Sequence, residues 1–188
     1  MEPQGDEIQR AARAAVLTNF AWVKGHADVW RLFSDPAALR VITSALAAPW
    51  SDDGVTQVCG IESRGFLLGG AVALRLGVGF TAVRKADGIL PGAKVERTSA
   101  ADYRGRSQTL RIQRERLGIA DRVVLVDDWA ERGSQATAVR ELVEACEATF
   151  LGLSVIVDQL ADDVRAGLKR VHAIVRAVEL GPSSYTGD

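Results

Sequence analysis

Residues 123–135 read VVLVDDWAERGSQ, and this stretch carries the strongest indication of the fold. Its four apolar residues are typical of a buried strand, and the two acidic residues that follow mark the start of a loop. Residues 134–145 then carry apolar side chains at helical spacing, and residues 150–157 form another apolar run. This order of strand, loop, helix and strand predicts a unit of parallel β-sheet with a covering helix.

The same order of elements occurs upstream. Residues 55–59 are predicted to form a strand, 60–64 a loop, 65–76 a helix and 79–83 a further strand. Two such units predict an α/β fold, in which helices flank a parallel sheet on both faces. We expect residues 173–180 to add a final strand.

The N-terminal region, residues 1–50, is predicted to be mainly helical. Residues 6–20 form an alanine-rich amphipathic pattern. Asp35 directly precedes Pro36, which is typical of a helix start because the carboxylate caps free amides and proline fits the first turn. No repeat or low-complexity linker interrupts the chain, so we predict a single domain over residues 1–188.

Composition narrows the class of protein. The chain has 188 residues, of which 47% are hydrophobic and 25% charged, and its net charge is −1. A net charge near zero disfavours a general nucleic-acid or membrane-surface binder, because nothing global attracts phosphate groups. The longest apolar stretch, residues 65–80, contains Arg75 and is too short to span a bilayer. We therefore expect a cytoplasmic protein, in which Cys59 and Cys146 are buried free thiols.

Charged residues gather where a ligand is expected. Ligands of open α/β sheets bind at the carboxyl ends of the strands. These ends carry residues 60–65, the pair Arg84 and Lys85, and the pair Asp127 and Asp128. The first and last of these segments open a helix, whose free amides favour an anion. The pattern predicts a phosphorylated ligand with a divalent cation; the alternative is a capping aspartate beside a solvated one.

Two further features bear on the chemistry. An ATPase of the P-loop type needs a Gly-x-x-x-x-Gly-Lys-Ser/Thr loop, and the sequence contains none. Residues 84–109 are polar, punctuated by glycine and long for a connection, which is typical of a functional lid or a disordered segment.

The linked motifs resemble the type I phosphoribosyltransferase family, and within it the adenine phosphoribosyltransferases. Residues 127–135 resemble the phosphoribosyl-pyrophosphate motif, and Ile61-Glu62-Ser63-Arg64-Gly65-Phe66 resembles the pyrophosphate loop. Further similar segments follow in the expected order: residues 76–80, 83–85, 90–92, 110–113 and 121–124. The similarity covers roughly residues 35–157. It implies a parallel sheet with a small N-terminal hood and a long flexible flap at residues 84–109.

The resemblance also implies a reaction, the transfer of ribose 5-phosphate from phosphoribosyl pyrophosphate to a purine-like base with Mg²⁺ as cofactor, and a homodimer. Asp127 and Asp128 would bind the ribose hydroxyls. Mg²⁺ would be bound mainly through the substrate, and Asp127 and Asp128 are candidate ligands for it. Asp102 would assist proton movement on the base. The 5-phosphate would be held by Arg132, Gly133, Ser134 and Gln135, and the pyrophosphate by Ser63, Arg64, Arg84 and Lys85.

The chain departs from the family pattern at three places. Residues 131–135 read ERGSQ where the family usually has ATGGT, so an acidic side chain lies close to the phosphate site and Arg132 offers a compensating charge. Trp129 replaces an aliphatic residue against the base, where an indole could stack on the ring or simply pack in the core. The Phe-Pro-x-x-Gly hood motif is missing, and His26 lies in the segment that replaces it.

These departures leave two alternatives to purine salvage. One is a non-catalytic regulator that binds a nucleotide or phosphoribosyl pyrophosphate on the same fold, which the altered residues 131–135 favour. The other is transfer to a non-purine acceptor. The retained acidic pair and Arg64 favour the enzyme.

Overall fold

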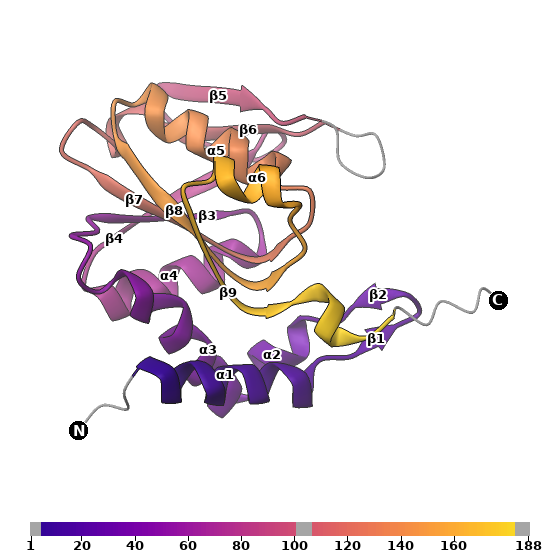
Figure 1. The fold of residues 1–188 in the computed structure, drawn as a ribbon. Helices are drawn as coiled ribbons and strands as arrows, with labels where there is room; N and C mark the ends of the chain where they lie inside the picture. Colours follow the sequence, from indigo (N-terminus) through magenta and orange to yellow (C-terminus); the bar gives the residue numbers. More distant parts are fainter. Residues whose placement is uncertain (1–4, 101–106, 183–188) are drawn as a thin grey trace.

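The computed structural model describes residues 5–100 and 107–182, and its central element is a seven-stranded sheet (Figure 1). The strand order is β5-β6-β4-β3-β7-β8-β9. Five strands run parallel: β3 (Gln57–Ile61), β4 (Gly79–Lys85), β7 (Arg122–Ala130), β8 (Thr149–Asp158) and β9 (Arg170–Arg176). The two predicted strand–helix–strand units therefore form the centre of the sheet, which confirms the α/β fold.

Two more strands at one edge make this mostly parallel sheet a mixed one. Strands β5 (Lys94–Thr98) and β6 (Thr109–Gln113) pair antiparallel, and β6 pairs antiparallel with β4. Leu110 and Ile112 are fully buried at alternate positions of β6, which fixes this strand against the core. Strand β5, which lies within the proposed flap at residues 84–109, is the edge strand of the sheet.

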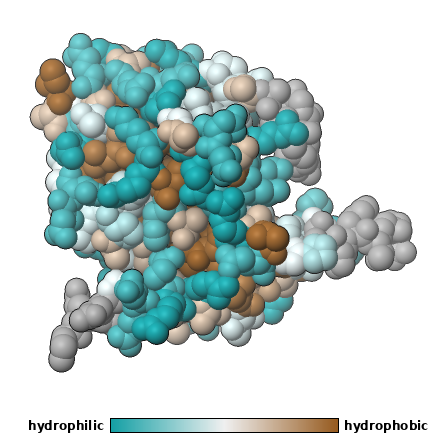
Figure 2. All heavy atoms as spheres, in the orientation of Figure 1, coloured by the Kyte–Doolittle hydropathy of each residue, from teal (hydrophilic) through white to brown (hydrophobic). Residues whose placement is uncertain are grey.

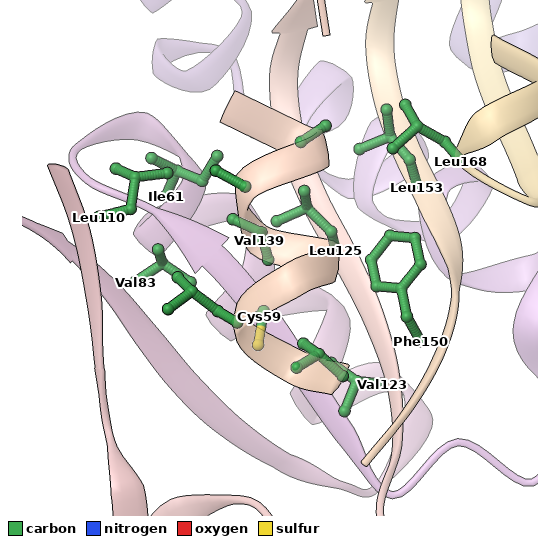
Figure 3. Close-up of a cluster of buried hydrophobic side chains, with 14 of the residues drawn as sticks. Cys59, Ile61, Val83, Leu110, Val123, Leu125, Val139, Phe150, Leu153 and Leu168 are labelled. Carbon is green, nitrogen blue, oxygen red and sulfur yellow. The ribbon is translucent and has the colours of Figure 1, made fainter. Parts of the chain in front are cut away.

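Helices cover both faces of the sheet (Figure 1). Helices α1 (Gly5–Asn19), α3 (Pro36–Ala47) and α4 (Arg64–Leu76) pack on one face, and α5 (Ser134–Ala145) packs on the other. Figure 3 shows Val139 of α5 beside Leu125 of β7, in the hydrophobic core between α5 and the sheet. Short elements complete the fold: α2 (Trp30–Ser34), α6 (Asp162–Gly167), and 3₁₀ turns at Ala48–Trp50, Arg114–Arg116 and Ala177–Leu180.

Local sequence signals explain several element ends. The predicted start of α3 is confirmed, because Asp35 Oδ1 accepts a hydrogen bond from Ala38 N at 2.6 Å and Pro36 occupies the first turn. The final strand was expected at residues 173–180. It instead ends at Arg176, because the next four residues turn into a 3₁₀ helix.

The surface and the cysteines are as the amino-acid composition indicates. Hydrophilic residues predominate on the face drawn in Figure 2, and apolar residues form separate groups. Within the part of the chain that the structure describes, no helix combines the length and apolarity needed to cross a bilayer. Cys59 and Cys146 are free and buried, as expected.

Candidate active site

A cavity of about 710 Å³ lies at the carboxyl ends of the parallel strands, where the sequence predicts the ligand. It is bordered by the ends of β3 and β7, by the loop before α5 and by an N-terminal hairpin. The following predicted site residues line it: Ser63, Arg64, Lys85, Asp127, Asp128, Trp129, Arg132, Gly133, Ser134 and Gln135. Arg84 is not among the lining residues, and Asp102 lies outside the described residues.

The two carboxylates belong to strand β7 and not to the loop in which we expected them. Pairing with β8 continues as far as Ala130, so the strand includes both acids. Asp128 is only 4% exposed, and Asp127 is half-buried beside it. The backbone N–H of Asp128 donates to Asp127 Oδ1 at 2.9 Å. The acidic pair is therefore fixed by the sheet, not carried on a loop.

One arginine balances the charge of this pair. Arg64 Nε donates to Asp128 Oδ2 at 2.6 Å, and the arginine side chain is 39% exposed toward the cavity. Burial raises the pKa of Asp127 well above its usual 3.8, and the neighbouring Asp128 raises this pKa further, whereas Arg64 opposes the rise. In this site the carboxyl group of Asp127 therefore resists ionisation, and the carboxylate of Asp128 is ion-paired with Arg64.

Glycines bring the arginine loop close to the acids. A Cβ atom on Gly60 would lie 2.1 Å from the carbonyl oxygen of Gly65, and one on Gly65 would lie 3.1 Å from Asp127 Oδ1. Only glycine permits this approach of β3 to the start of α4. Ser63 is exposed at the N-terminus of α4, and the Glu62–Ser63 peptide bond is cis. The pyrophosphate loop of the sequence prediction therefore borders the acidic pair directly.

The basic pair at the end of β4 divides between two environments. Lys85 lines the cavity, and its backbone N–H donates to Glu62 Oε2 at 3.1 Å. Arg84 instead forms an ion pair with Glu62 at 3.2 Å, and its guanidinium lies 5.9 Å from the centre of the Phe66 ring. Successive side chains of a strand point to opposite faces, so the two basic residues do not act as a pair.

The loop before α5 forms the opposite wall. Gly133 adopts a φ of 71° at the N-cap of this 12-residue helix. A Cβ atom there would lie 2.5 Å from Val164 Cγ1 and 2.9 Å from Leu160 Cδ2, so the α6 region closes behind the loop. Glu131 and Arg132 line the cavity with the first residues of α5. The free amides of a helix N-terminus at this place suit an anionic group.

A small hairpin with an aromatic cluster covers one end of the cavity. Strands β1 (Trp22–Val23) and β2 (His26–Ala27) pair antiparallel, and exposed His26 lines the cavity. The Trp22 ring lies 5.9 Å from that of Trp129 and 5.2 Å from that of Phe20. Trp129 therefore lines the cavity and also joins the hairpin to β7.

Sequence reasoning missed one residue of this wall. Trp129 Nε1 donates to Oε1 of Gln159, which follows β8 and lines the cavity. The hairpin was missed as well, although Lys24 and Gly25 both have positive φ, as a two-residue hairpin turn requires. A lysine–glycine turn is a weaker signal than asparagine–glycine, but it was present in the sequence.

Comparison with known proteins gives the family. The chain is 41% identical over 131 residues to the adenine phosphoribosyltransferase of Streptomyces coelicolor, a match that covers 70% of each protein. The chain belongs to the adenine phosphoribosyltransferase family. The resemblance drawn from the sequence motifs is thereby confirmed.

Solved structures agree with this family. A phosphoribosyltransferase from Giardia lamblia, complexed with 9-deazaadenine, is 35% identical, with a TM-score of 0.73 over 80% of this chain and 86% of that one. The adenine phosphoribosyltransferase of Rhodothermus marinus is 27% identical, with a TM-score of 0.79 over 89% and 99%. No family model matches the chain. The solved structures thus support the family fold for this chain.

Proposed function

We propose that this protein transfers ribose 5-phosphate from phosphoribosyl pyrophosphate to a purine base and releases pyrophosphate. The observation that carries the proposal is the acidic pair on β7, which lies in one cavity with an arginine loop and a helix N-terminus. Family membership supplies the reaction class. This combination of charge, hydroxyl-binding groups and free amides supports a ligand that is a sugar with a phosphate at one end and a pyrophosphate at the other.

The roles follow from the chemistry of each group. Carboxylates accept hydrogen bonds from hydroxyls, so Asp127 and Asp128 would hold the ribose diol. The amides at the start of α5, with Arg132, Ser134 and Gln135, would hold the 5-phosphate. Ser63, Arg64 and Lys85 would bind the pyrophosphate, and Arg84 would reach it only by leaving Glu62. Asp102 remains a sequence-based candidate for the proton step on the base.

The reaction needs no protein nucleophile. The bond between the anomeric carbon and the pyrophosphate oxygen breaks with its electron pair on the oxygen, and a ring nitrogen of the base forms the new bond. Arg64 and Lys85 would stabilise the negative charge that develops on the leaving group. The cavity would hold the base and the sugar in line, which lowers the barrier by positioning.

A divalent cation fits this site only together with the substrate. Among residues 5–100 and 107–182, no group of three or more acidic, histidine or cysteine side chains is placed to hold a metal ion. Mg²⁺ prefers a few carboxylate ligands combined with phosphate oxygens and waters. We propose that Mg²⁺ would be held mainly by the pyrophosphate, with the carboxyl groups of Asp127 and Asp128 nearby, and would supply positive charge to the leaving group.

We also propose that two copies of the chain form a homodimer in the cytoplasm. An apolar face of α4 supports the dimer, since Leu67 is 40% exposed and Leu74 is 84% exposed, and positions seven apart share one face of a helix. Phe80 adds a 36% exposed ring. Light scattering after gel filtration should give a dimer mass for the wild type and a monomer mass for Leu74→Asp; a monomeric wild type would contradict this proposal.

The reaction is tested by a base screen. Phosphoribosyl pyrophosphate and Mg²⁺ are supplied with adenine, hypoxanthine or guanine, and pyrophosphate release is followed. We expect release with at least one purine and none without a base. In the double variant Asp127→Asn, Asp128→Asn, calorimetry should show no binding of phosphoribosyl pyrophosphate by a folded protein. Unchanged affinity in that variant would remove the proposed role of the acidic pair.

A further inference from the structure

The side-chain amide of Gln159 is oriented by its partner. An indole N–H can only donate a hydrogen bond, so the Gln159 atom that lies 3.0 Å from Trp129 Nε1 is the carbonyl oxygen. The amino group must then point away from the indole nitrogen. Gln159 is exposed and lines the cavity, and within the described ranges, 5–100 and 107–182, no hydrogen bond from this amino group is formed.

Hydrogen bonds and ion pairs also fix the backbone position of Gln159. Gln159 N donates to the carbonyl oxygen of Ala130 at 2.8 Å, which ties the residue to the end of β7. The preceding residue, Asp158, is fully buried. Its carboxylate accepts from Leu160 N at 2.8 Å and forms ion pairs with Arg165 and Arg176. The neighbours of Gln159 in the chain, Asp158 and Leu160, are thus both held by hydrogen bonds. The backbone of Gln159 is therefore fixed beside Trp129.

The two tryptophans of this wall, Trp22 and Trp129, offer ring surface to the cavity. Trp22 Nε1 donates to the carbonyl oxygen of Leu180 at 3.2 Å, so both indole N–H groups of the wall are already used. The rings of Trp22 and Trp129 meet in an edge-to-face arrangement. A flat ring placed against Trp129 would therefore meet a hydrogen-bond donor from Gln159 and would find none on the two indoles.

We infer that Gln159 is a specificity-determining residue, whose amino group donates a hydrogen bond to an acceptor atom on the purine ring. This inference rests on the proposed function, because it places the acceptor base beside Trp129. The ligand class is a purine with a ring nitrogen or carbonyl oxygen at this edge. A missing donor opposite a buried polar ring atom costs affinity, and about 1.4 kcal/mol corresponds to tenfold.

The decisive substitution is Gln159→Glu. It preserves the shape of the side chain and the acceptor for Trp129 Nε1, but it replaces the amino group by a carboxylate oxygen. Gln159→Leu removes the donor without adding charge. Gln113→Glu is the matched control, because it makes the same chemical change at a residue that does not line the cavity.

Calorimetry with AMP and with ribose 5-phosphate measures the contribution of the ring, since the second ligand lacks it. We expect AMP affinity to fall at least about tenfold in both Gln159 variants, ribose 5-phosphate affinity to stay within about twofold of wild type, and Gln113→Glu to change neither. Parallel losses for both ligands, or unchanged AMP affinity, would overturn the inference. So would a wild type that binds AMP no more tightly than ribose 5-phosphate.

This design separates the inference from the proposed reaction. A wild type that releases no pyrophosphate with any purine, yet shows the AMP-specific loss, supports the inference and contradicts the reaction. A wild type that is active, with Gln159 variants that bind AMP normally, contradicts the inference alone.

Discussion

The ion pair between Arg64 and Asp128 has a measurable structural role in addition to the proposed catalytic one. The substitution Arg64→Ala removes the cation that lies 2.6 Å from a carboxylate with only 6% of its side chain exposed. An exposed pair contributes less than about 1 kcal/mol, whereas breaking a fully buried pair costs about 3–5 kcal/mol. Arg64 is 39% exposed, so we expect a loss of about 1–3 kcal/mol in unfolding free energy.

A second substitution identifies the cause of that loss. Asp128→Asn keeps the shape of the side chain but needs no counter-charge, so adding it to Arg64→Ala should restore most of the lost stability. In a chain of this size, 1 kcal/mol corresponds to about 2–4 °C in Tm. Arg64→Ala should therefore melt about 2–12 °C below wild type, and the double variant should recover much of that difference.

Urea unfolding of the wild type, both single variants and the double variant measures the coupling energy. Pyrophosphate release measured on the same proteins should show the opposite pattern, because the double variant regains stability and loses activity further. A coupling energy below about 0.5 kcal/mol, as found for independent sites, would refute the reasoning that the pair stabilises the ligand-free fold.

Three further predictions rest on pKa shifts. The folded-state pKa of Asp127 lies well above 3.8, so the stability of the fold decreases as pH rises from 3.8 to this raised pKa. Asp127→Asn should therefore raise Tm at pH 7 while abolishing activity, and a lower Tm would contradict this. Burial lowers the pKa of His172 below 6.5, so Tm should fall as pH drops below 6.5 in the wild type but not in His172→Gln; equal pH profiles would argue against it. Burial raises the pKa of Cys59 to about 12, so iodoacetamide should label it only after unfolding; rapid labelling of the native protein, detected by mass spectrometry, would count against the burial.

Apolar runs predicted the sheet well because strands buried on both faces need continuous apolar sequence. The same signal failed where pairing continued past the apolar run. Asp127 and Asp128 lie in β7 because Trp129 pairs with Val157 and Ala130 with Asp158. A local pattern does not contain these partners, so the sequence predicted a loop.

The candidate site was predictable where one segment supplies both the motif and its surroundings. Residues 127–135 and Arg64 belong to such segments, and they line one cavity. Gln159 could not be found in this way, because its partner Trp129 is 30 residues away and the two meet only across neighbouring strands. Arg84 could not be separated from Lys85 until the direction of each side chain along β4 was known.

The Arg64–Asp128 ion pair occupies the groups that a substrate would need, and substrate binding must therefore replace this pair. Arg64 cannot bind pyrophosphate fully while it donates to Asp128 through Nε. A substrate brings a pyrophosphate anion for the arginine and ribose hydroxyls for the aspartates, so each partner of the ion pair gains a replacement. Hydroxyl donors also favour the charged form of a carboxylate, which would oppose the raised pKa of Asp127. Phosphoribosyl pyrophosphate carries both groups, whereas pyrophosphate alone leaves Asp128 uncompensated. We therefore expect the complete substrate to bind more tightly than the sum of separate pyrophosphate and ribose 5-phosphate contacts at this pair.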